Sequence, residues 1–378
     1  MSDQPFVIGV DIGGTKIKAG AVSLRTGNTA ARIIASRHIA TPRATPAAFY
    51  DAIAALVHEV RAGVAETHQR LLPLVAVAHP GRFLPDGRLA RGTTPNLGTS
   101  PGQFDGLRPA HELEQRLGCP VTAENDAVAQ MRFGVDVLLH DPSIRPQLLG
   151  QMVVYLGPGT GMGGGVARVS AAGEVTAITD GHLFDLQVPG IGDGTLTAEE
   201  LFTGPAIARR VAEENTRLSR PIDPPRGGRL DEILAEPEAP AEHRAVAERI
   251  AEEFGGILAA LIRAIHAGTI TKVRVERTPD GRALRHVDEP DRAWSVADTE
   301  AVRGVRRFIF GGFIGCSTQL GARIRRHALE RLRREEMREV EIFQIPVDSA
   351  DAGLLGAVKA MTAPKSPMTK HQSPNNHQ

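Results

Sequence analysis

Hydrophobic residues recur along the chain with two different periods, and each period predicts one kind of element. The stretches 47–66 and 243–268 both carry apolar residues at helical spacing. In the longer stretch the apolar face consists of Val246, Ile250, Phe254, Ile257, Leu258, Leu261, Ile262 and Ile265. Both stretches are therefore predicted to be amphipathic helices.

Shorter apolar runs predict strands between the helices. Residues 6–24 and 151–170 each predict two strands joined by a glycine turn, and residues 73–81 predict a single strand. Residues 108–131 predict a helix that stops at Gly118, a short strand, and a second helix that begins near Asn125 and Asp126. Elements of both kinds follow at 305–337, 340–347 and 349–361, so the chain belongs to the α/β class.

Three segments lack a regular period. Residues 215–244 are rich in proline and charge and are predicted to be loose. Residues 273–294 predict an exposed hairpin that turns at 279–281, and the polar tail 363–378 is expected to be disordered. The two glycine hairpins resemble each other, which indicates a duplicated half.

The overall charge and the cysteine content exclude several classes of protein. The chain has 44 basic and 44 acidic residues, so its zero net charge provides no general attraction to nucleic acid or to a membrane. No run has the length of a membrane span, and the N-terminus lacks the features of a signal peptide. Two cysteines exclude a disulfide framework and a cysteine-built zinc cluster. We expect a cytoplasmic protein with no nucleic-acid or membrane partner.

The first glycine hairpin contains the sequence DIGGTK at residues 11–16. Glycines allow the backbone to approach a phosphate closely, and Thr15 adds a hydroxyl donor. The carboxylate of Asp11 is a suitable ligand for magnesium through water. An ordinary tight hairpin turn explains the same residues.

The second hairpin contains GTGMGGG at residues 159–165 and matches the dinucleotide-binding pattern G-x-G-x-x-G. That pattern requires a helix after the glycines, whereas the following residues predict a strand. A dehydrogenase is therefore disfavoured. Two glycine hairpins, one in each half, favour a nucleotide whose phosphates lie between them.

Asp126 lies in the segment ENDA, between an apolar strand and a predicted helix. A carboxylate at a strand end can accept a proton from a substrate hydroxyl. The alternative is a helix N-cap, a role that Asn125 or Asp126 serves equally well.

Several motifs occur together in one order, and they carry a family resemblance: VIGVDIGGTKIKAGAV, PNLG, ENDAVAQ, GTGMGGG, DGH, EELFTGPAI, FGGFIG and DAGLLGA. In this order they resemble the ROK family of sugar kinases and repressors, within the actin and hexokinase fold superfamily. The resemblance implies a two-domain, actin-like ATPase fold, which is a duplicated ribonuclease-H-like fold with an interdomain cleft. It further implies that ATP with Mg²⁺ phosphorylates a hydroxyl of a hexose or hexose derivative.

The resemblance assigns roles to individual residues. Asp126 matches the catalytic base that takes the proton of the sugar hydroxyl. Positions that match sugar contacts are Gly81, Asn96, Asn125, His182 and Glu199. The first phosphate loop comprises Asp11, Gly13, Gly14, Thr15 and Lys16. The second comprises Gly159, Thr160, Gly161 and Gly163. Gly311 and Gly312 match the adenosine-side turn.

The resemblance also implies a domain plan. Residues 1–122 form the N-terminal domain, and residues 123–348 form a larger C-terminal domain with an insertion at 274–304. Residues 349–362 form a helix that returns to the N-terminal domain. Family members often form homodimers or homotetramers, and the sequence leaves this open.

The chain departs from the family pattern at several positions. Thr179 replaces a glutamate that contacts the sugar, and the cysteines of the family's zinc cluster are absent, so no structural zinc is expected. Phe313 takes the place of a third glycine after Gly312. His79 and Arg82 stand where small or apolar residues are usual. Either they recognise a different substituent of the substrate, or Arg82 is an exposed loop arginine without contacts.

Three functions remain open. A glucokinase-like kinase fits the retained loops and Asp126. The loss of the glutamate at Thr179 favours either an amino-sugar or N-acetyl-sugar kinase or a catalytically silent, regulatory sugar-binding protein. A DNA-binding repressor is disfavoured, because only residues 1–6 precede the first strand and the net charge is zero.

Overall fold

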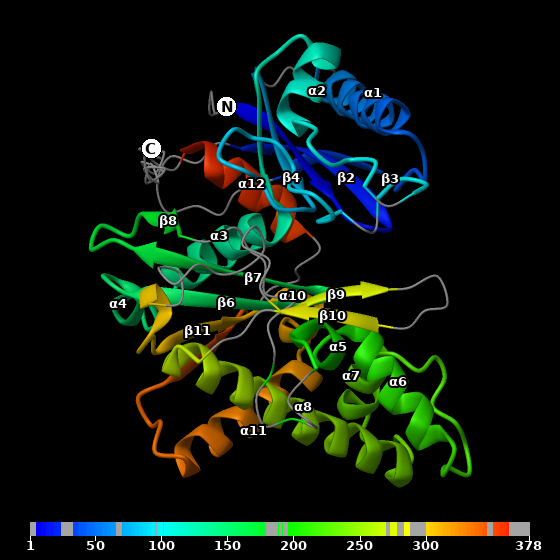
Figure 1. Ribbon diagram of the computed structural model, residues 1–378, viewed down its shortest axis with the longest axis vertical. Helices are drawn as coiled ribbons and strands as arrows, with labels where there is room; N and C mark the ends of the chain where they lie inside the picture. The colour runs from blue at the N-terminus through cyan, green and yellow to red at the C-terminus, as the bar shows by residue number, and fades with distance from the viewer. Residues whose placement is uncertain are drawn as a thin grey trace, which may run out of the picture.

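The computed structural model describes residues 5–23, 33–65, 70–94, 97–100, 102–178, 188, 191, 196–269, 273–277, 283–287, 300–345 and 351–362. Two five-stranded sheets dominate the described part of the chain, one in each half of the molecule, and helices cover both (Figure 1). The arrangement confirms the α/β class.

The first sheet has the strand order β3-β2-β1-β4-β5. Its strands are β1 (Phe6–Ile12), β2 (Lys16–Ser23), β3 (Ile33–Ala40), β4 (Leu71–His79) and β5 (Val121–Asn125). β2 is antiparallel to β1 and β3, whereas β4 is parallel to β1 and β5. Side chains alternate along β1, so Ile8 and Val10 share a core with α1 (Pro46–Ala65) and α2 (Pro109–Leu117), and Val7 faces the opposite side.

The second sheet repeats this topology, with the order β12-β11-β6-β7-β8. Its strands are β6 (Met152–Pro158), β7 (Met162–Val169), β8 (Val175–Ala177), β11 (Arg307–Phe310) and β12 (Glu341–Gln344). β7 is antiparallel to β6 and β8, and β11 is parallel to β6 and β12. Each half therefore contains an antiparallel meander continued by parallel strands, which confirms the predicted duplication.

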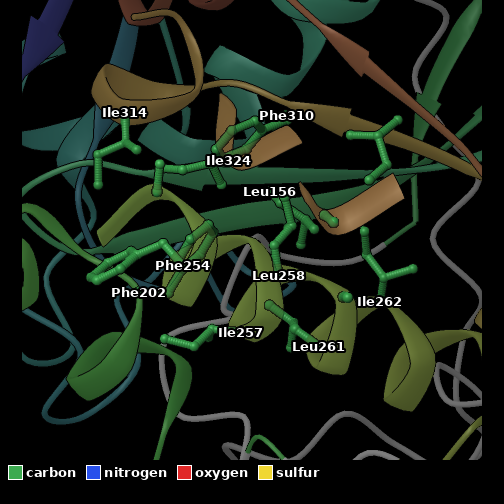
Figure 2. Packing of buried hydrophobic residues seen from close by; sticks show 14 of the residues in the cluster. Leu156, Phe202, Phe254, Ile257, Leu258, Leu261, Ile262, Phe310, Ile314 and Ile324 are labelled. Carbon is green, nitrogen blue, oxygen red and sulfur yellow. The ribbon is translucent and has the colours of Figure 1, made fainter. Parts of the chain in front are cut away.

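The larger core lies below the second sheet (Figure 2). Leu156 and Phe310 of the sheet face α8 (Ala241–Ala267), whose predicted apolar face is buried throughout. A Cβ atom on Gly255 of α8 would lie only 2.5 Å from Cβ of His327, a residue of α11. The glycine therefore allows α8 and α11 to pack closely together. The described helices of this half also include α4 (Arg145–Leu148), α5 (Ala198–Leu201), α6 (Gly204–Asn215), α7 (Gly227–Ala235), α10 (Gly312–Gly315) and α11 (Leu320–Arg334).

A pair of helices, α3 (Asp126–Leu139) and α12 (Ala352–Thr362), lies between the two sheets (Figure 1). α12 packs on the first sheet through Leu354 and Val358, and α3 packs on the second through residues such as Val135. The two helices touch at Gly356, where a Cβ atom would lie 1.8 Å from the carbonyl oxygen of Ala129. This contact joins the two halves of the molecule.

One segment that was predicted to be loose contains a helix in the structure. Residues 215–244 contain α7, because Leu230, Ile233 and Leu234 are buried against the core. The predicted hairpin at 273–294 pairs as β9 (Val273–Arg277) with β10 (Ala283–Val287), and its turn lies outside the described residues, as does the tail. The proposed boundary at 122–123 falls within β5, whose pairing with β4 keeps it in the first sheet.

No helix among the described residues has the length and apolarity to span a membrane.

Candidate active site at the junction of the two halves

The first glycine hairpin joins β1 to β2, as predicted. The Gly13 amide donates to the carbonyl oxygen of Lys16 at 3.0 Å, which closes the turn. Thr41 fixes the turn from the side: its hydroxyl donates to the carbonyl oxygen of Gly13 at 2.7 Å, and its amide donates to that of Thr15 at 3.0 Å. Gly14 is half-buried, and Thr15 and Lys16 are exposed, so the tip of the turn is accessible to a ligand.

Asp11 lies near the end of β1 and points at the first turn of α12. A Cβ atom on Gly353 would be 2.4 Å from Oδ1 of Asp11, so the carboxyl group rests on the helix backbone. Burial raises the pKa of Asp11 to about 7, and the negative charges of Asp126 and Asp351 add to the effect. Lys18 forms an ion pair with Asp351. The site therefore includes charges from both ends of the chain.

Asp126 is the first residue of α3, and Asn125 is its N-cap. The Asn125 side-chain oxygen accepts from the amides of Ala127 at 2.9 Å and Val128 at 3.1 Å. Its amide group donates to the carbonyl oxygen of Gly81 at 2.9 Å. The cap interpretation is thus confirmed for Asn125. Because Asn125 performs this role, the carboxyl group of Asp126 is not needed as the cap.

The carboxyl group of Asp126 has an unusual environment for an acid at a helix start. Burial raises its pKa to about 6, although the Ala127 amide donates to Oδ1 at 2.9 Å and opposes that shift. A carboxyl group with such a pKa is largely ionised at neutral pH and still basic enough to accept a proton.

The second glycine hairpin joins β6 to β7 and contacts the start of α3. The Gly159 amide donates to the carbonyl oxygen of Gly161 at 2.8 Å. A Cβ atom on Gly163 would lie 3.0 Å from Cβ of Ala127, so this hairpin packs beside Asp126. The structure thereby brings the second predicted phosphate loop to the predicted catalytic base.

Glu199 in α5 binds the backbone of this hairpin. Its Oε2 atom accepts from the Met162 amide at 3.1 Å, and a Cβ atom on Gly161 would lie 3.2 Å from the same oxygen. The Gly204 amide at the start of α6 donates to the carbonyl oxygen of Gly159 at 2.8 Å. Glu199 therefore has a structural contact that the sequence did not reveal, next to the predicted loop residues Gly159, Thr160 and Gly161.

The predicted adenosine-side turn also packs on the second hairpin. Gly312 has a φ of 64°, a left-handed conformation that favours glycine, and its amide donates to the Tyr155 hydroxyl at 2.9 Å. A Cβ atom on Gly312 would lie 2.6 Å from the carbonyl oxygen of Pro158, and one on Gly311 would lie 2.5 Å from the Tyr155 ring. Both glycines are required by close packing.

The structure corrects the expectations for His79 and Arg82. His79 is fully buried beside Phe49 and Tyr50, so it is a core residue and does not read the substrate. Its Nδ1 donates to the Pro80 carbonyl at 2.5 Å, and because burial lowers its pKa to about 4, the neutral ring accepts from the Tyr50 hydroxyl through Nε2 at 3.2 Å. Nε and Nη1 of Arg82 are inaccessible to solvent, so Arg82 is not an exposed loop arginine.

Gly81 shapes the loop between these residues. Its φ is 104°, and a Cβ atom there would lie 2.6 Å from Cγ2 of Thr94. Since its carbonyl oxygen is held by Asn125, the loop after β4 is fixed to the start of α3. Asn96, Thr179 and His182 were singled out from the sequence and lie outside the described residues.

Some residues of the site were missed by sequence reasoning. Tyr155 had only the pattern of a core strand residue, yet its hydroxyl holds the Gly312 turn. Lys18 and Asp351 are far apart in sequence, and no local pattern links them. The two glycines of DAGLLGA, Gly353 and Gly356, were the available indication that α12 approaches its neighbours closely.

The carboxyl groups of Asp11 and Asp126 fit a role beside a magnesium-bound nucleotide. Each half contributes one carboxyl group and one glycine hairpin, and the charge of Asp126 already raises the pKa of Asp11. A divalent cation prefers such oxygen ligands and would relieve their repulsion. Among the described residues, no group of three or more His, Cys, Asp or Glu side chains is arranged as a metal site.

Comparison with known proteins defines the family. The model of the ROK family matches residues 7–363, and the chain therefore belongs to the ROK family. The chain is 34% identical over 165 residues to a glucokinase of Streptomyces coelicolor, an alignment that covers 43% of each chain. It is 31% identical over 176 residues to an N-acetyl-D-glucosamine kinase of Photobacterium profundum, covering 47% of each. The alignments thus span less than half the length of these curated relatives.

Solved structures support the fold across nearly the whole chain. The structure of a ROK family glucokinase from Streptomyces griseus, in complex with glucose and AMPPNP, superposes with a TM-score of 0.60 at 21% identity. The superposition covers 94% of this chain and 98% of that one. The fold is the duplicated α/β fold of actin-like ATPases.

Proposed function

We propose that this chain is an ATP-dependent sugar kinase that transfers the γ-phosphate of ATP to a hydroxyl group of a hexose or hexose derivative. The observation that carries the proposal is the position of Asp126. It begins α3 directly beside the second glycine hairpin, and its charge acts on Asp11 below the first hairpin. A base, two glycine hairpins and a magnesium-compatible carboxyl group are thus assembled from both halves.

In the proposed reaction the sugar hydroxyl oxygen attacks the γ-phosphorus. Its bond to phosphorus forms as the bond from phosphorus to the β,γ-bridging oxygen breaks, and ADP leaves. Asp126 accepts the hydroxyl proton on its carboxylate, a step matched to its raised pKa. Magnesium bound with ATP would supply charge neutralisation, and Asp11 would hold it through water.

The two glycine hairpins position the phosphates. Phosphoryl transfer requires mainly orientation and charge stabilisation, which backbone amides provide where no side chain intervenes. The first hairpin would contribute through Gly13, Gly14, Thr15 and Lys16. The second would contribute through Gly159, Thr160, Gly161 and Gly163.

The sugar side of the proposal rests on Asn125 and Glu199 together with Gly81, Asn96 and His182. Asn125 uses its oxygen for the helix cap, and one of its two amide hydrogens binds Gly81, so the second amide hydrogen is the group suited to a sugar hydroxyl. Glu199 accepts from the Met162 amide through Oε2, and its carboxylate group is the candidate acceptor for a sugar hydroxyl. Sugar binding would thereby be coupled to the second hairpin.

ADP release in the presence of a panel of hexoses, amino sugars and N-acetyl sugars tests this proposal, with Asp126→Asn as the control. We expect the wild type to release ADP only with an acceptor sugar. Thr179 in place of the family glutamate favours a substrate other than glucose, so the best acceptor is expected among the modified sugars.

The same substitution at Thr179 favours a second candidate, a regulatory protein that binds sugar without phosphorylating it. Calorimetric titration separates the two functions. A regulatory protein binds a sugar of the panel in the calorimeter and releases no ADP with any of them.

A further inference from the structure

Phe313 is a large apolar residue that the proposed chemistry does not use. It lies in α10, directly after the turn formed by Gly311 and Gly312, and 60% of its surface is exposed. Its neighbour Ile314 is buried in the core, so the helix itself does not need an apolar residue at position 313. The exposed ring is therefore available to a planar ligand.

The backbone contacts of this turn place Phe313 along the path of a bound nucleotide. The second hairpin touches α3 through Gly163 of β7, where a Cβ atom would lie 3.0 Å from Cβ of Ala127. It touches the Phe313 turn through β6, because a Cβ atom on Gly312 would lie 2.6 Å from the Gly157 carbonyl carbon. Gly157 and Gly163 pair directly, so the start of α3 and the Phe313 turn contact neighbouring strands of the hairpin, and a nucleotide that crosses the hairpin from Asp126 would bring its nucleoside to the turn.

The surroundings of the ring leave room for a flat group. A Cβ atom on Gly228, in the first turn of α7, would have Cζ of Phe313 as its nearest neighbour, at 3.6 Å. Gly228 is half-buried and presents no side chain to the ring, while the preceding residues 223–226 are exposed. A planar base can thus approach the exposed part of the aromatic ring from solvent.

We propose that Phe313 is a stacking platform for the base of the phosphoryl donor and makes the site favour purine nucleotides. This inference rests on the proposed kinase function and adds the recognition of the donor to it. Every base can stack on an aromatic ring, but the larger purine overlaps it more than a pyrimidine does. Inorganic tripolyphosphate has no base and gains nothing from Phe313.

The test compares binding of MgATP, MgCTP and magnesium tripolyphosphate to the full chain by calorimetric titration. The variants are Phe313→Ala, Phe313→Leu, which keeps an apolar side chain without the ring, and Phe313→Trp. We expect Phe313→Ala and Phe313→Leu to weaken MgATP binding about tenfold. Phe313→Trp should retain it, and tripolyphosphate should bind equally to all four proteins.

Four results would overturn the inference. Unchanged MgATP affinity in Phe313→Ala excludes stacking, and an equal loss for tripolyphosphate shows a general disturbance of the phosphate loops. A change of oligomeric state in Phe313→Ala with unchanged nucleotide binding, measured by sedimentation velocity, assigns the ring to a contact between two copies. A wild type that binds no ATP at all would refute the proposed function together with this inference.

Discussion

Gly353 lies directly against the carboxyl group of Asp11: a Cβ atom built on Gly353 would be 2.4 Å from Oδ1 and 2.6 Å from Oδ2. Helix α12 therefore packs against the carboxyl group that lies just before the first glycine hairpin. The same helix meets α3 at Gly356 and so reaches the element that carries Asp126. Residues from both ends of the chain thus fix the relative positions of the two carboxyl groups.

We predict that Gly353→Ala impairs both activity and stability. Alanine is the better helix former, so the helix alone would gain from the change. The steric overlap of the new methyl group with the Asp11 carboxyl group outweighs that gain in helix propensity. We therefore expect the unfolding free energy to fall by about 1–3 kcal/mol. We also expect a drop of about tenfold or more in kcat/KM, because the carboxyl group is displaced.

Gly63→Ala is the matched control for that variant. Gly63 lies in α1, and a Cβ atom there meets nothing within 4 Å. The Gly63→Ala variant should have a free energy of unfolding that is higher by about 0.5–1 kcal/mol, and it should keep full activity. Urea unfolding and ADP release measure both variants, and wild-type behaviour of Gly353→Ala would contradict the close contact.

The raised pKa of Asp126 predicts an acid limb in the pH profile of kcat/KM. The base must be ionised, and its pKa is about 6, so the rate should fall as the pH drops below about 6. Above that value this group no longer limits the rate. An acid limb near the ordinary value of 3.8 would show that burial does not act on Asp126.

Asp126→Asn is predicted to abolish transfer without destabilising the fold. Burial disfavours the charged carboxylate, so the native state binds a proton more readily than the unfolded state, and stability rises as the pH falls from about 6 towards 3.8. A neutral amide at this position removes the cost of burying the charged carboxylate. At pH 7.5 we therefore expect Asp126→Asn to have a melting temperature equal to or above that of the wild type. A clear drop in melting temperature would show that the charge itself supports the structure.

Two variants of Glu199 separate its two roles. Glu199→Gln keeps an oxygen that can accept from the Met162 amide, whereas Glu199→Ala does not. If Glu199 also binds the sugar, both variants should raise the KM for sugar, and only Glu199→Ala should weaken MgATP binding through the second hairpin. A Glu199→Gln variant with the wild-type KM for sugar would limit Glu199 to the hairpin contact.

His79→Phe is predicted to reduce stability and to leave the choice of sugar unchanged. The substitution leaves the Tyr50 hydroxyl without its acceptor and the Pro80 carbonyl without its donor, at a cost of about 1–3 kcal/mol. Burial lowers the pKa of His79 to about 4, so the unfolded state takes up the proton first. The wild type should therefore lose stability between pH 6.5 and about 4, and His79→Phe should lose less. An altered sugar preference would restore a direct role in recognition.

The parts of the fold with strong local patterns were predictable from the sequence. Both glycine hairpins combine a turn that needs glycine with flanking strands, and the face of α8 repeats over a long stretch, so each was found where the structure has it. α7 was missed because proline and charge dominate its surroundings, while only Leu230, Ile233 and Leu234 carry its apolar face.

The site was harder to predict, because its contacts are not local. His79 ended a strand beside a loop and resembled a substrate ligand, but side chains of α1 enclose it. Asn125 and Asp126 were equivalent as caps in the sequence, and only the bonds from Ala127 and Val128 separate their roles. The ion pair between Lys18 and Asp351 joins opposite ends of the chain.

The most direct test of the central claim is sugar-dependent ADP release by the wild type and by Asp126→Asn under identical conditions. We expect the wild type to release ADP with at least one hexose or modified hexose. In the variant we expect the rate of ADP release to fall about a thousandfold or more, while the same sugar and MgATP bind with unchanged affinity. Undiminished ADP release by Asp126→Asn would contradict the assignment of the base and the proposed mechanism with it.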